Sequence, residues 1–140
     1  MCYNLNGETE GDFMNKNTKY WIETAQYDIE TAQAMLDTGR YLYVGFTCHL
    51  TIEKALKAII AESGKFPPKI HNLTELAKIA NVWDDMKEEK RQLLRELNPL
   101  NIAGRYPDYK SKIESLLTTT YCNQLIIKVK ELFLWIEEKL

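Results

Sequence analysis

Residues 41–63 read YLYVGFTCHLTIEKALKAIIAES, and this stretch decides the fold. As an α-helix of ~23 residues it would be ~35 Å long, enough to run the length of a small domain. Its apolar residues form two stripes at helical spacing rather than one. The first stripe comprises Gly45, Cys48, Ile52, Ala55 and Ile59, and the second comprises Leu42, Phe46, His49, Glu53, Leu56 and Ile60. We therefore expect a central helix that is covered on two sides.

The second stripe contains two polar residues, His49 and Glu53, which lie four positions apart and so share a helical face. A carboxylate among apolar side chains needs a partner, because burial without one disfavours its ionised form. His49 is a candidate catalytic proton shuttle, and the alternative is a histidine that only satisfies its hydrogen bonds in the core. The partner of Glu53 is the main functional question that the sequence raises.

The composition is that of one soluble domain. The chain has 140 residues, of which 45% are hydrophobic and 27% charged, and a formal net charge of −2. This charge gives no general attraction to nucleic acid or membrane, so an anion site must be local. The absence of a signal peptide and of a long apolar run favours a cytoplasmic protein without a membrane contact. The three cysteines lack metal-ligand spacing, so no metal is expected and reduced thiols are predicted at Cys2, Cys48 and Cys122.

Residues 1–17 are polar, contain glycine and show no periodicity, which predicts a mobile N-terminal tail with Met14 as an alternative native start. Residues 18–140 form the predicted helical domain. Its first helix should end at Gly39 and carry apolar residues at helical spacing, namely Ile22, Ala25, Ile29, Ala32 and Leu36. Asp28 lies beside this stripe and is expected to be solvated.

Three further helices complete the prediction. Asn72 begins a capping box before a short helix over about residues 73–80, and Asp85 begins another before a helix over about residues 85–97. The last helix is predicted over about residues 119–140 from its apolar stripe. No segment is typical of a strand. The predicted fold class is therefore all-α, an up-and-down helical bundle of about five helices.

Residues 98–109 contain two prolines and a glycine and are predicted to form a structured loop or a broken helix. Our hypothesis pairs Arg105 of this segment with the buried Glu53, because a guanidinium can bind a carboxylate through two hydrogen bonds. This structural pair has two interpretations. In the first it only fixes the segment to the predicted helix over residues 41–63, and in the second the remaining donors of Arg105 also face a groove that binds phosphate. Arg105 is also a candidate catalytic residue. The predicted ligand-binding residues are Glu53, Lys57, Arg105, Tyr106 and Asp108, with nearby positive charge from Lys110 and Lys112.

Several short motifs follow one another over residues 18–139. They are Ala25-x-x-Asp28-x-x-x-Ala32, Gly39-x-Tyr41, Phe46, Glu53-Lys54-Ala55-Leu56-Lys57-Ala58, His71-Asn72-Leu73-x-x-Leu76 and Arg105-Tyr106-Pro107-Asp108. In this order they resemble the HEPN domain family. The resemblance implies a bundle of four to five helices that commonly dimerises and is often encoded beside a minimal nucleotidyltransferase. It also implies proposed nucleotide binding, and some members are toxins of toxin–antitoxin pairs.

Many members of the family that this chain resembles are metal-independent RNases, which use an arginine and, after four to six intervening residues, a histidine. This sequence departs from that pattern. Its histidines are His49 and His71, Arg40 precedes His49 by too many residues, and no histidine follows Arg105. A general acid or base that titrates near neutral pH is therefore missing from the expected place.

Three functions remain open at this point. The first is a binding module without catalysis or cofactor, which recognises a nucleotide or RNA or docks a minimal nucleotidyltransferase. The second is an RNase whose dimer interface places His49 or His71 of one subunit opposite Arg105 of the other. The third is a helical scaffolding dimer. A homodimer is expected because a thin bundle exposes apolar surface, here with the aromatic residues Tyr20, Trp21 and Tyr43.

Overall fold

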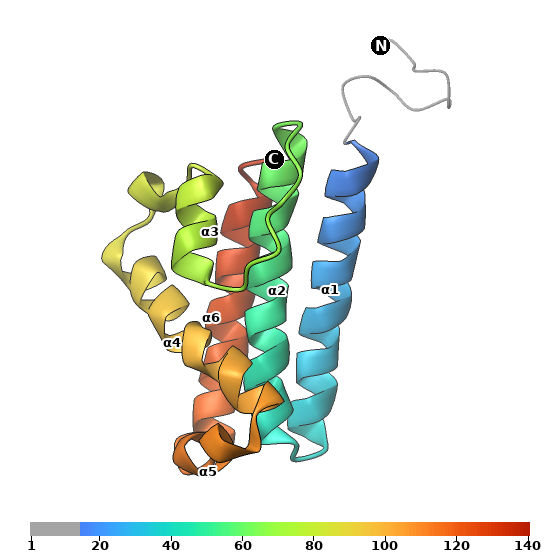
Figure 1. The fold of residues 1–140 in the computed structure, drawn as a ribbon. Coiled ribbons are helices and arrows are strands. Elements are labelled where there is room, and N and C mark those ends of the chain that lie inside the picture. Colours follow the sequence, from blue (N-terminus) through green and yellow to red (C-terminus); the bar gives the residue numbers. More distant parts are fainter. Residues whose placement is uncertain (1–14) are drawn as a thin grey trace.

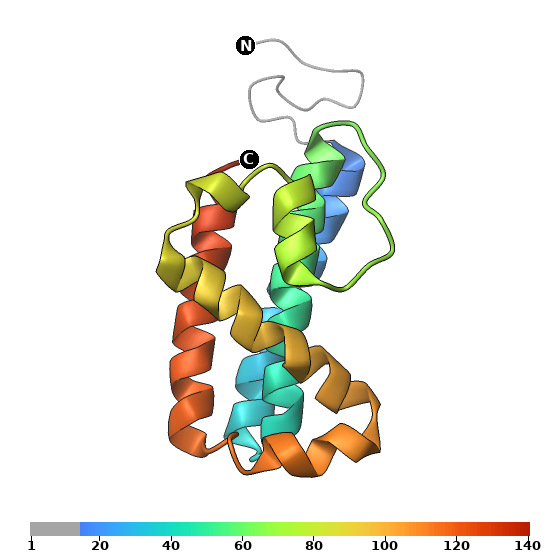
Figure 2. The same cartoon turned by 60° about the vertical axis from the view of Figure 1, so that its left-hand side comes forward.

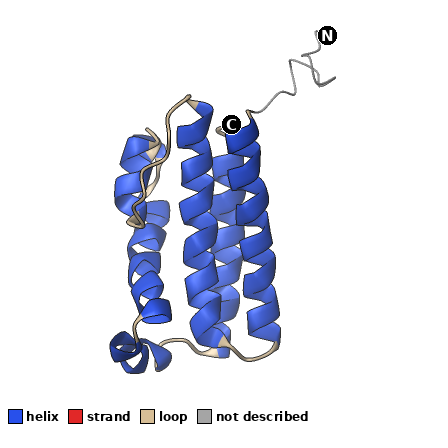
Figure 3. Cartoon of the chain, turned by 45° about the vertical axis from the view of Figure 1, so that its right-hand side comes forward, coloured by secondary structure: helices blue, strands red, loops and turns tan. Residues whose placement is uncertain are grey.

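The computed structural model describes residues 15–140, with the exception of the side chains of residues 107, 109 and 110. These residues form a helical bundle, and no strand occurs among them (Figure 1, Figure 3). The elements are α1 (Lys16–Asp37), α2 (Tyr41–Glu62), α3 (Leu73–Ile79), the 3-10 turn η2 (Trp83–Asp85), α4 (Glu88–Arg105), α5 (Pro107–Glu114) and α6 (Thr119–Glu137). The predicted all-α bundle is confirmed. The predictions for residues 1–14, including Met14 and Cys2, lie outside the described residues.

The central element of the bundle is α2, and α1, α4 and α6 pack around it (Figure 2). Fourteen of its 22 residues are buried. Cys48, Ile52 and Ala55 of the first predicted stripe are fully buried. His49 and Leu56 of the second stripe are fully buried as well. The prediction of a helix covered on two sides is therefore confirmed.

An antiparallel hairpin joins α1 to α2. Gly39 in its turn has a φ of 73°, a left-handed conformation that glycine adopts without strain. α1 begins at Lys16, slightly earlier than predicted, because the side chain of Asn15 accepts a hydrogen bond from the backbone N–H of Thr18. Nδ2 of Asn15 also donates to the carbonyl of Ala61 at 2.9 Å, which ties the start of α1 to the end of α2. The first turn of α1 thus belongs to the bundle and not to the predicted tail.

The two predicted capping boxes have different outcomes. Asn72 caps α3 as expected, since its side-chain oxygen accepts from the backbone N–H of Glu75 at 3.1 Å. Asp85 does not cap α4, and this prediction is wrong. Asp85 lies in η2, where its carboxylate pairs with Lys139 at 3.2 Å, and α4 begins only at Glu88.

The segment 98–109 is a broken helix, one of the two predicted alternatives. α4 continues through Pro99, because its buried face, which includes Leu100, packs on α2 and offsets the backbone hydrogen bond that proline removes. Tyr106 then adopts an extended conformation, which separates α4 from α5. This break places Arg105 at the exposed end of α4.

Two of the predicted reduced thiols, Cys48 and Cys122, are buried and form no disulfide. Burial raises the pKa of Cys122 to about 11, so this group stays a thiol near neutral pH. Within residues 15–140, no helix is long and apolar enough to cross a bilayer. The described side chains also contain no group of three histidines, cysteines or carboxylates arranged to hold a metal ion.

Candidate functional site

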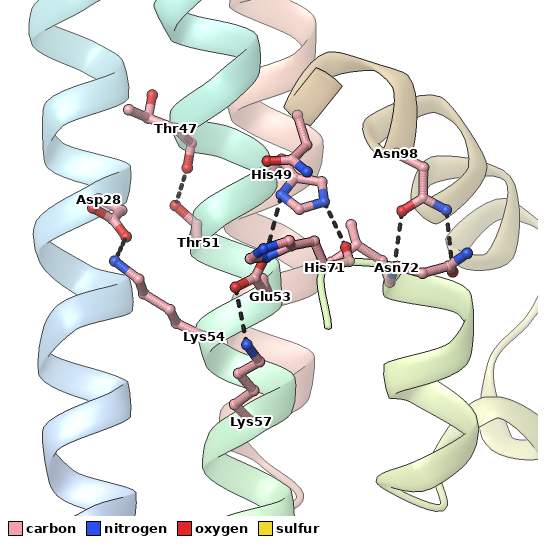
Figure 4. Close-up of polar contacts among 12 residues, drawn as sticks. Asp28, Thr47, His49, Thr51, Glu53, Lys54, Lys57, His71, Asn72 and Asn98 are labelled. Carbon is pink, nitrogen blue, oxygen red and sulfur yellow. Dashed lines mark hydrogen bonds and ion pairs between the residues drawn. The ribbon is translucent and has the colours of Figure 1, made fainter. Parts of the chain in front are cut away.

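Glu53 is the buried charge around which the site is built. It is 4% exposed on α2 and lies among the core residues of the second stripe. Its Oε2 accepts a hydrogen bond from Nζ of Lys57 at 3.1 Å, and its Oε1 accepts one from Nδ1 of His71 at 2.9 Å (Figure 4). These two donors supply the partners that a buried carboxylate needs.

The hypothesis of a Glu53–Arg105 pair is therefore wrong. Nε of Arg105 instead donates to Oδ1 of Asn101, one helical turn earlier on α4, at 3.1 Å. The physical reason is local: Lys57 lies four residues after Glu53 on the same helix and meets its carboxylate directly. Arg105 is exposed at the end of α4, and Glu53 has two hydrogen-bond donors without it.

His49 is fully buried, one turn before Glu53. Its Nε2 lies 2.9 Å from the carbonyl oxygen of His71 and must carry the proton, since a carbonyl only accepts. The other ring nitrogen, Nδ1, has no hydrogen-bond partner in the described structure and lies 3.7 Å from Oε1 of Glu53. Burial lowers the pKa of His49 to about 4, although the Glu53 carboxylate opposes this shift. His49 is thus a neutral core residue that positions the chain before α3, and it has no path to a substrate in solvent.

His71 is the histidine that combines a fixed orientation with exposure. Its Nδ1 donates to Glu53, while the carbonyl of the same residue accepts from His49, so α2 holds it at two points (Figure 4). The side chain is 49% exposed. No hydrogen bond among the described residues uses its Nε2. A carboxylate on Nδ1 fixes the tautomer, which leaves Nε2 as a proton acceptor toward solvent.

The expectation that Asp28 is solvated is also wrong. Asp28 is 7% exposed, and its Oδ2 lies 2.6 Å from Nζ of Lys54, which joins α1 to α2. Lys57 makes a second link between these helices, because its Nζ lies 5.6 Å from the centre of the Trp21 ring. A polar layer therefore runs through the α1–α2 interface. The sequence did not reveal it, because both links pair residues on different helices.

The predicted ligand-binding residues fall into two groups. Glu53 and Lys57 are buried and paired with each other. Arg105, Tyr106 and Asp108 are exposed around the break between α4 and α5. Tyr106 is 58% exposed, so its ring is available to a ligand. The side chain of residue 110 is not among the described ones, and Lys112 is exposed on α5.

Arg105 has a defined orientation despite its exposure. Its guanidinium carbon lies 5.3 Å from the centre of the Phe46 ring on α2, in addition to the bond from Nε to Asn101. Gly104 makes this approach feasible, because a Cβ there would lie 2.6 to 2.9 Å from atoms of Phe46. Among the described residues, no hydrogen bond uses the two terminal nitrogens of Arg105. They form an open edge for two parallel hydrogen bonds to an anion.

Sequence reasoning missed Asn101 and the role of His71. Asn101 is 8% exposed, and its part in holding Arg105 follows from a spacing of four residues on a helix that the prediction ended too early. For His71, the sequence indicated a place in the entry to α3 and, in the dimeric RNase hypothesis, a position opposite Arg105, but not its bond to Glu53. The need of Glu53 for a partner was the signal that could have identified it.

This chain is similar to a known protein family in sequence and to a solved structure in fold. The family model described as HEPN domain matches residues 18–139. The fold is similar to that of TT1696 from Thermus thermophilus, a crystal structure with 22% sequence identity and a TM-score of 0.76, and the alignment covers 90% of this chain and 100% of that one. No curated protein matches. At 22% identity the structural likeness shows the fold alone. The matched range of the family model contains all the motifs quoted above and nearly all described residues, and the chain therefore belongs to the HEPN domain family.

Proposed function

We propose that this chain is a HEPN-family binding module that recognises a phosphate-bearing nucleotide or RNA and acts with a separate minimal nucleotidyltransferase, as in toxin–antitoxin pairs. In this proposal the chain has no catalysis and no cofactor of its own. The observation that carries it is the orientation of Arg105: its Nε donates to Asn101, while no hydrogen bond among the described side chains uses its two terminal nitrogens. An arginine that is already oriented loses less side-chain entropy when it binds an anion.

The surroundings of Arg105 fit a nucleotide better than a bare anion. Tyr106 follows it directly and is 58% exposed, so a base can stack on the ring while the phosphate meets the guanidinium. The overall charge of −2 supplies no long-range attraction, so binding must depend on this local contact and weaken as salt rises.

Two of the candidate catalytic residues, Arg105 and His49, are unsuited to proton transfer. Arg105 can stabilise negative charge on a phosphate but cannot accept a proton near neutral pH. His49 reaches neither solvent nor a ligand, since its exposed fraction is 0%, and its pKa is lowered to about 4. Neither residue can therefore remove a proton from a ribose hydroxyl.

A homodimer remains part of the proposal. The exposed aromatic residues of the α1–α2 hairpin support it: Tyr20 is 62%, Tyr27 70% and Tyr43 48% exposed. Trp21, also expected at this surface, is half-buried beside Lys57. Light scattering at about 50 µM, in the range where weak dimers form, should give twice the chain mass. A monomer at this concentration would contradict the dimer.

Binding is tested by fluorescence anisotropy with a labelled single-stranded RNA of about ten nucleotides, and by competition with ATP. Arg105→Ala should weaken binding about tenfold, the effect expected when a charged hydrogen-bonded contact of about 1.5 kcal/mol is lost. Arg95→Ala is the matched control, because Arg95 is an exposed arginine of the same helix that pairs with Glu88. Equal losses in both variants would mean that only net charge matters, and no loss in Arg105→Ala would refute the site.

One observation favours a second function, a metal-independent RNase. Glu53 orients His71 so that Nε2 is available as a general base, an arrangement found in hydrolytic active sites. The test is incubation of the purified chain with labelled RNA in EDTA. The binding module predicts no cleavage above background, whereas cleavage that disappears in His71→Asn would establish the RNase. Co-purification with a co-expressed minimal nucleotidyltransferase tests the partner.

A further inference from the structure

A groove of about 650 Å³ lies between α4 and α6. Its lining comes from the first half of α4, from the second half of α6 and from Glu138 at the end of α6. Both helices pack on α2, and α4 crosses the bundle obliquely, so that the two hardly approach each other (Figure 2).

The floor of this α4–α6 groove is apolar. Leu93 and Leu132 are buried at 6% and 2% exposure, and Trp135 is half-buried beside them. The apolar surface also extends beyond the groove along α6, since Leu134 at its edge is 60% exposed and Ile127 is 57% exposed. These two residues are seven positions apart, the spacing of a seam against which another helix packs. An occupant that runs along α6 therefore fits better than a compact ligand.

The rim of the groove is acidic. It carries the four carboxylates of Glu89, Glu96, Glu131 and Glu138 against two ammonium groups, those of Lys90 and Lys128. Nζ of Lys90 lies 5.5 Å from the centre of the Trp135 ring, so part of this positive charge is turned toward the floor. The excess of negative charge selects an occupant with positive side chains.

We propose that the α4–α6 groove binds an amphipathic helix of a partner protein, with apolar side chains on the floor and lysines or arginines against the glutamates. The lined part of α6, from Lys128 to Glu138, is about 15 Å long, which corresponds to about three turns of a bound helix. This surface is separate from the Arg105 site, and the proposal does not depend on that site.

Two other occupants have the wrong charge. Residues 1–14 contain Glu8, Glu10 and Asp12 but no lysine or arginine, so this segment would bring negative charge to an acidic rim. A second copy of the chain, placed groove to groove, would bring the same glutamates together. Like charges across an interface oppose association.

The test uses two fluorescein-labelled peptides of about 14 residues, roughly four helical turns, with leucines at helical spacing. One peptide has lysines beside the leucines, and the other has glutamates at the same positions. Fluorescence anisotropy measures binding to the full chain. The lysine peptide should bind at least about tenfold more tightly than the glutamate peptide, with a Kd below about 100 µM. Leu134→Ser and the double variant Glu131→Lys, Glu138→Lys should each weaken it at least about fivefold.

Leu116→Ser is the matched control, because Leu116 is a 65% exposed leucine outside the groove, between α5 and α6. It should leave peptide binding unchanged, as should Arg105→Ala, which separates this test from that of the nucleotide site. Three results would overturn the proposal: no binding of the lysine peptide, equal binding of both peptides, or equal losses in Leu134→Ser and Leu116→Ser. A dimer in light scattering that Leu134→Ser converts to a monomer would assign the groove to a second copy instead.

Discussion

Replacement of Glu53 by glutamine tests the central polar cluster most directly. The change keeps the size of the side chain and one acceptor oxygen but removes the negative charge. Lys57 is then left with 7% side-chain exposure and no carboxylate partner. Removing one partner of a buried ion pair costs ~3–5 kcal/mol of unfolding free energy. Because glutamine keeps one acceptor oxygen, we expect Glu53→Gln to lie near the lower end of this range, at about 3 kcal/mol. For a domain of this size we expect the Tm to fall by about 10 °C.

The measurement is urea unfolding followed by circular dichroism at pH 7.5, together with Lys57→Met and the double variant. Lys57→Met should cost less, because the exposed His71 can still donate to the carboxylate. The double variant should be at least about 1 kcal/mol more stable than the sum of the two single losses, since it leaves no unpaired buried charge. Glu23→Gln is the control, because Glu23 and Lys19 form a pair at 3.9 Å with about two-thirds of each side chain exposed.

The reasoning would be refuted in two ways. If the free energy of unfolding of Glu53→Gln lies within about 1 kcal/mol of that of the original chain, charged partners do not stabilise the buried carboxylate. If the losses of Glu53→Gln and Lys57→Met simply add, the two residues do not act as a pair. An equal effect of Glu23→Gln would show that the assay reports net charge and not burial.

Three further predictions concern stability. Arg105→Ala should change the free energy of unfolding by no more than about 1 kcal/mol in urea titrations, because Arg105 is exposed and does not neutralise a buried carboxylate. The pKa of His49 is about 4 in the folded chain and near 6.5 in the unfolded chain, so on acidification the unfolded chain binds this proton first. The free energy of unfolding should therefore fall by up to about 3 kcal/mol as the pH drops from about 6.5 to about 4. His49→Gln should flatten this part of the pH profile. Gly104→Ala should cost about 1–3 kcal/mol, measured by thermal unfolding, because the new methyl group would displace Phe46; a neutral result would mean that the ring moves freely.

The parts of the fold that follow from local patterns could be predicted. The two stripes of α2 predicted a helix buried on two sides, and Asn72 predicted the start of α3, because periodicity and capping depend on residues within one or two turns. Asp85 misled the prediction because its carboxylate pairs with Lys139, which is distant in sequence. The sequence left a loop and a broken helix open for the segment with Pro99, because packing against α2, which outweighs the local helix breaker, is not visible in the sequence.

The sequence predicted that Glu53 requires a charge or hydrogen-bond partner, but it did not predict which residues contact it. The apolar neighbours of Glu53 indicated that it requires a partner, which is correct because the cost of burying a charge does not depend on the fold. Which residue meets that need depends on tertiary placement. Arg105 is suitable by its chemistry, whereas the chain before α3 brings His71 across α2 and Lys57 is already one turn away.

The motif Glu53-Lys54-Ala55-Leu56-Lys57 shows why the proposed ligand site lies elsewhere. Lys57 is held by Glu53, and Lys54 is held by Asp28 of α1, so the charges of this motif are neutralised within the chain. An incoming phosphate could use either lysine only by drawing it away from a buried carboxylate, which costs free energy and offsets the new phosphate–lysine pair. Arg105 carries no such cost, because the partner that fixes it, Asn101, is uncharged. In the proposed site, the positive charge offered to a nucleotide is therefore one that the fold does not need to neutralise a buried carboxylate.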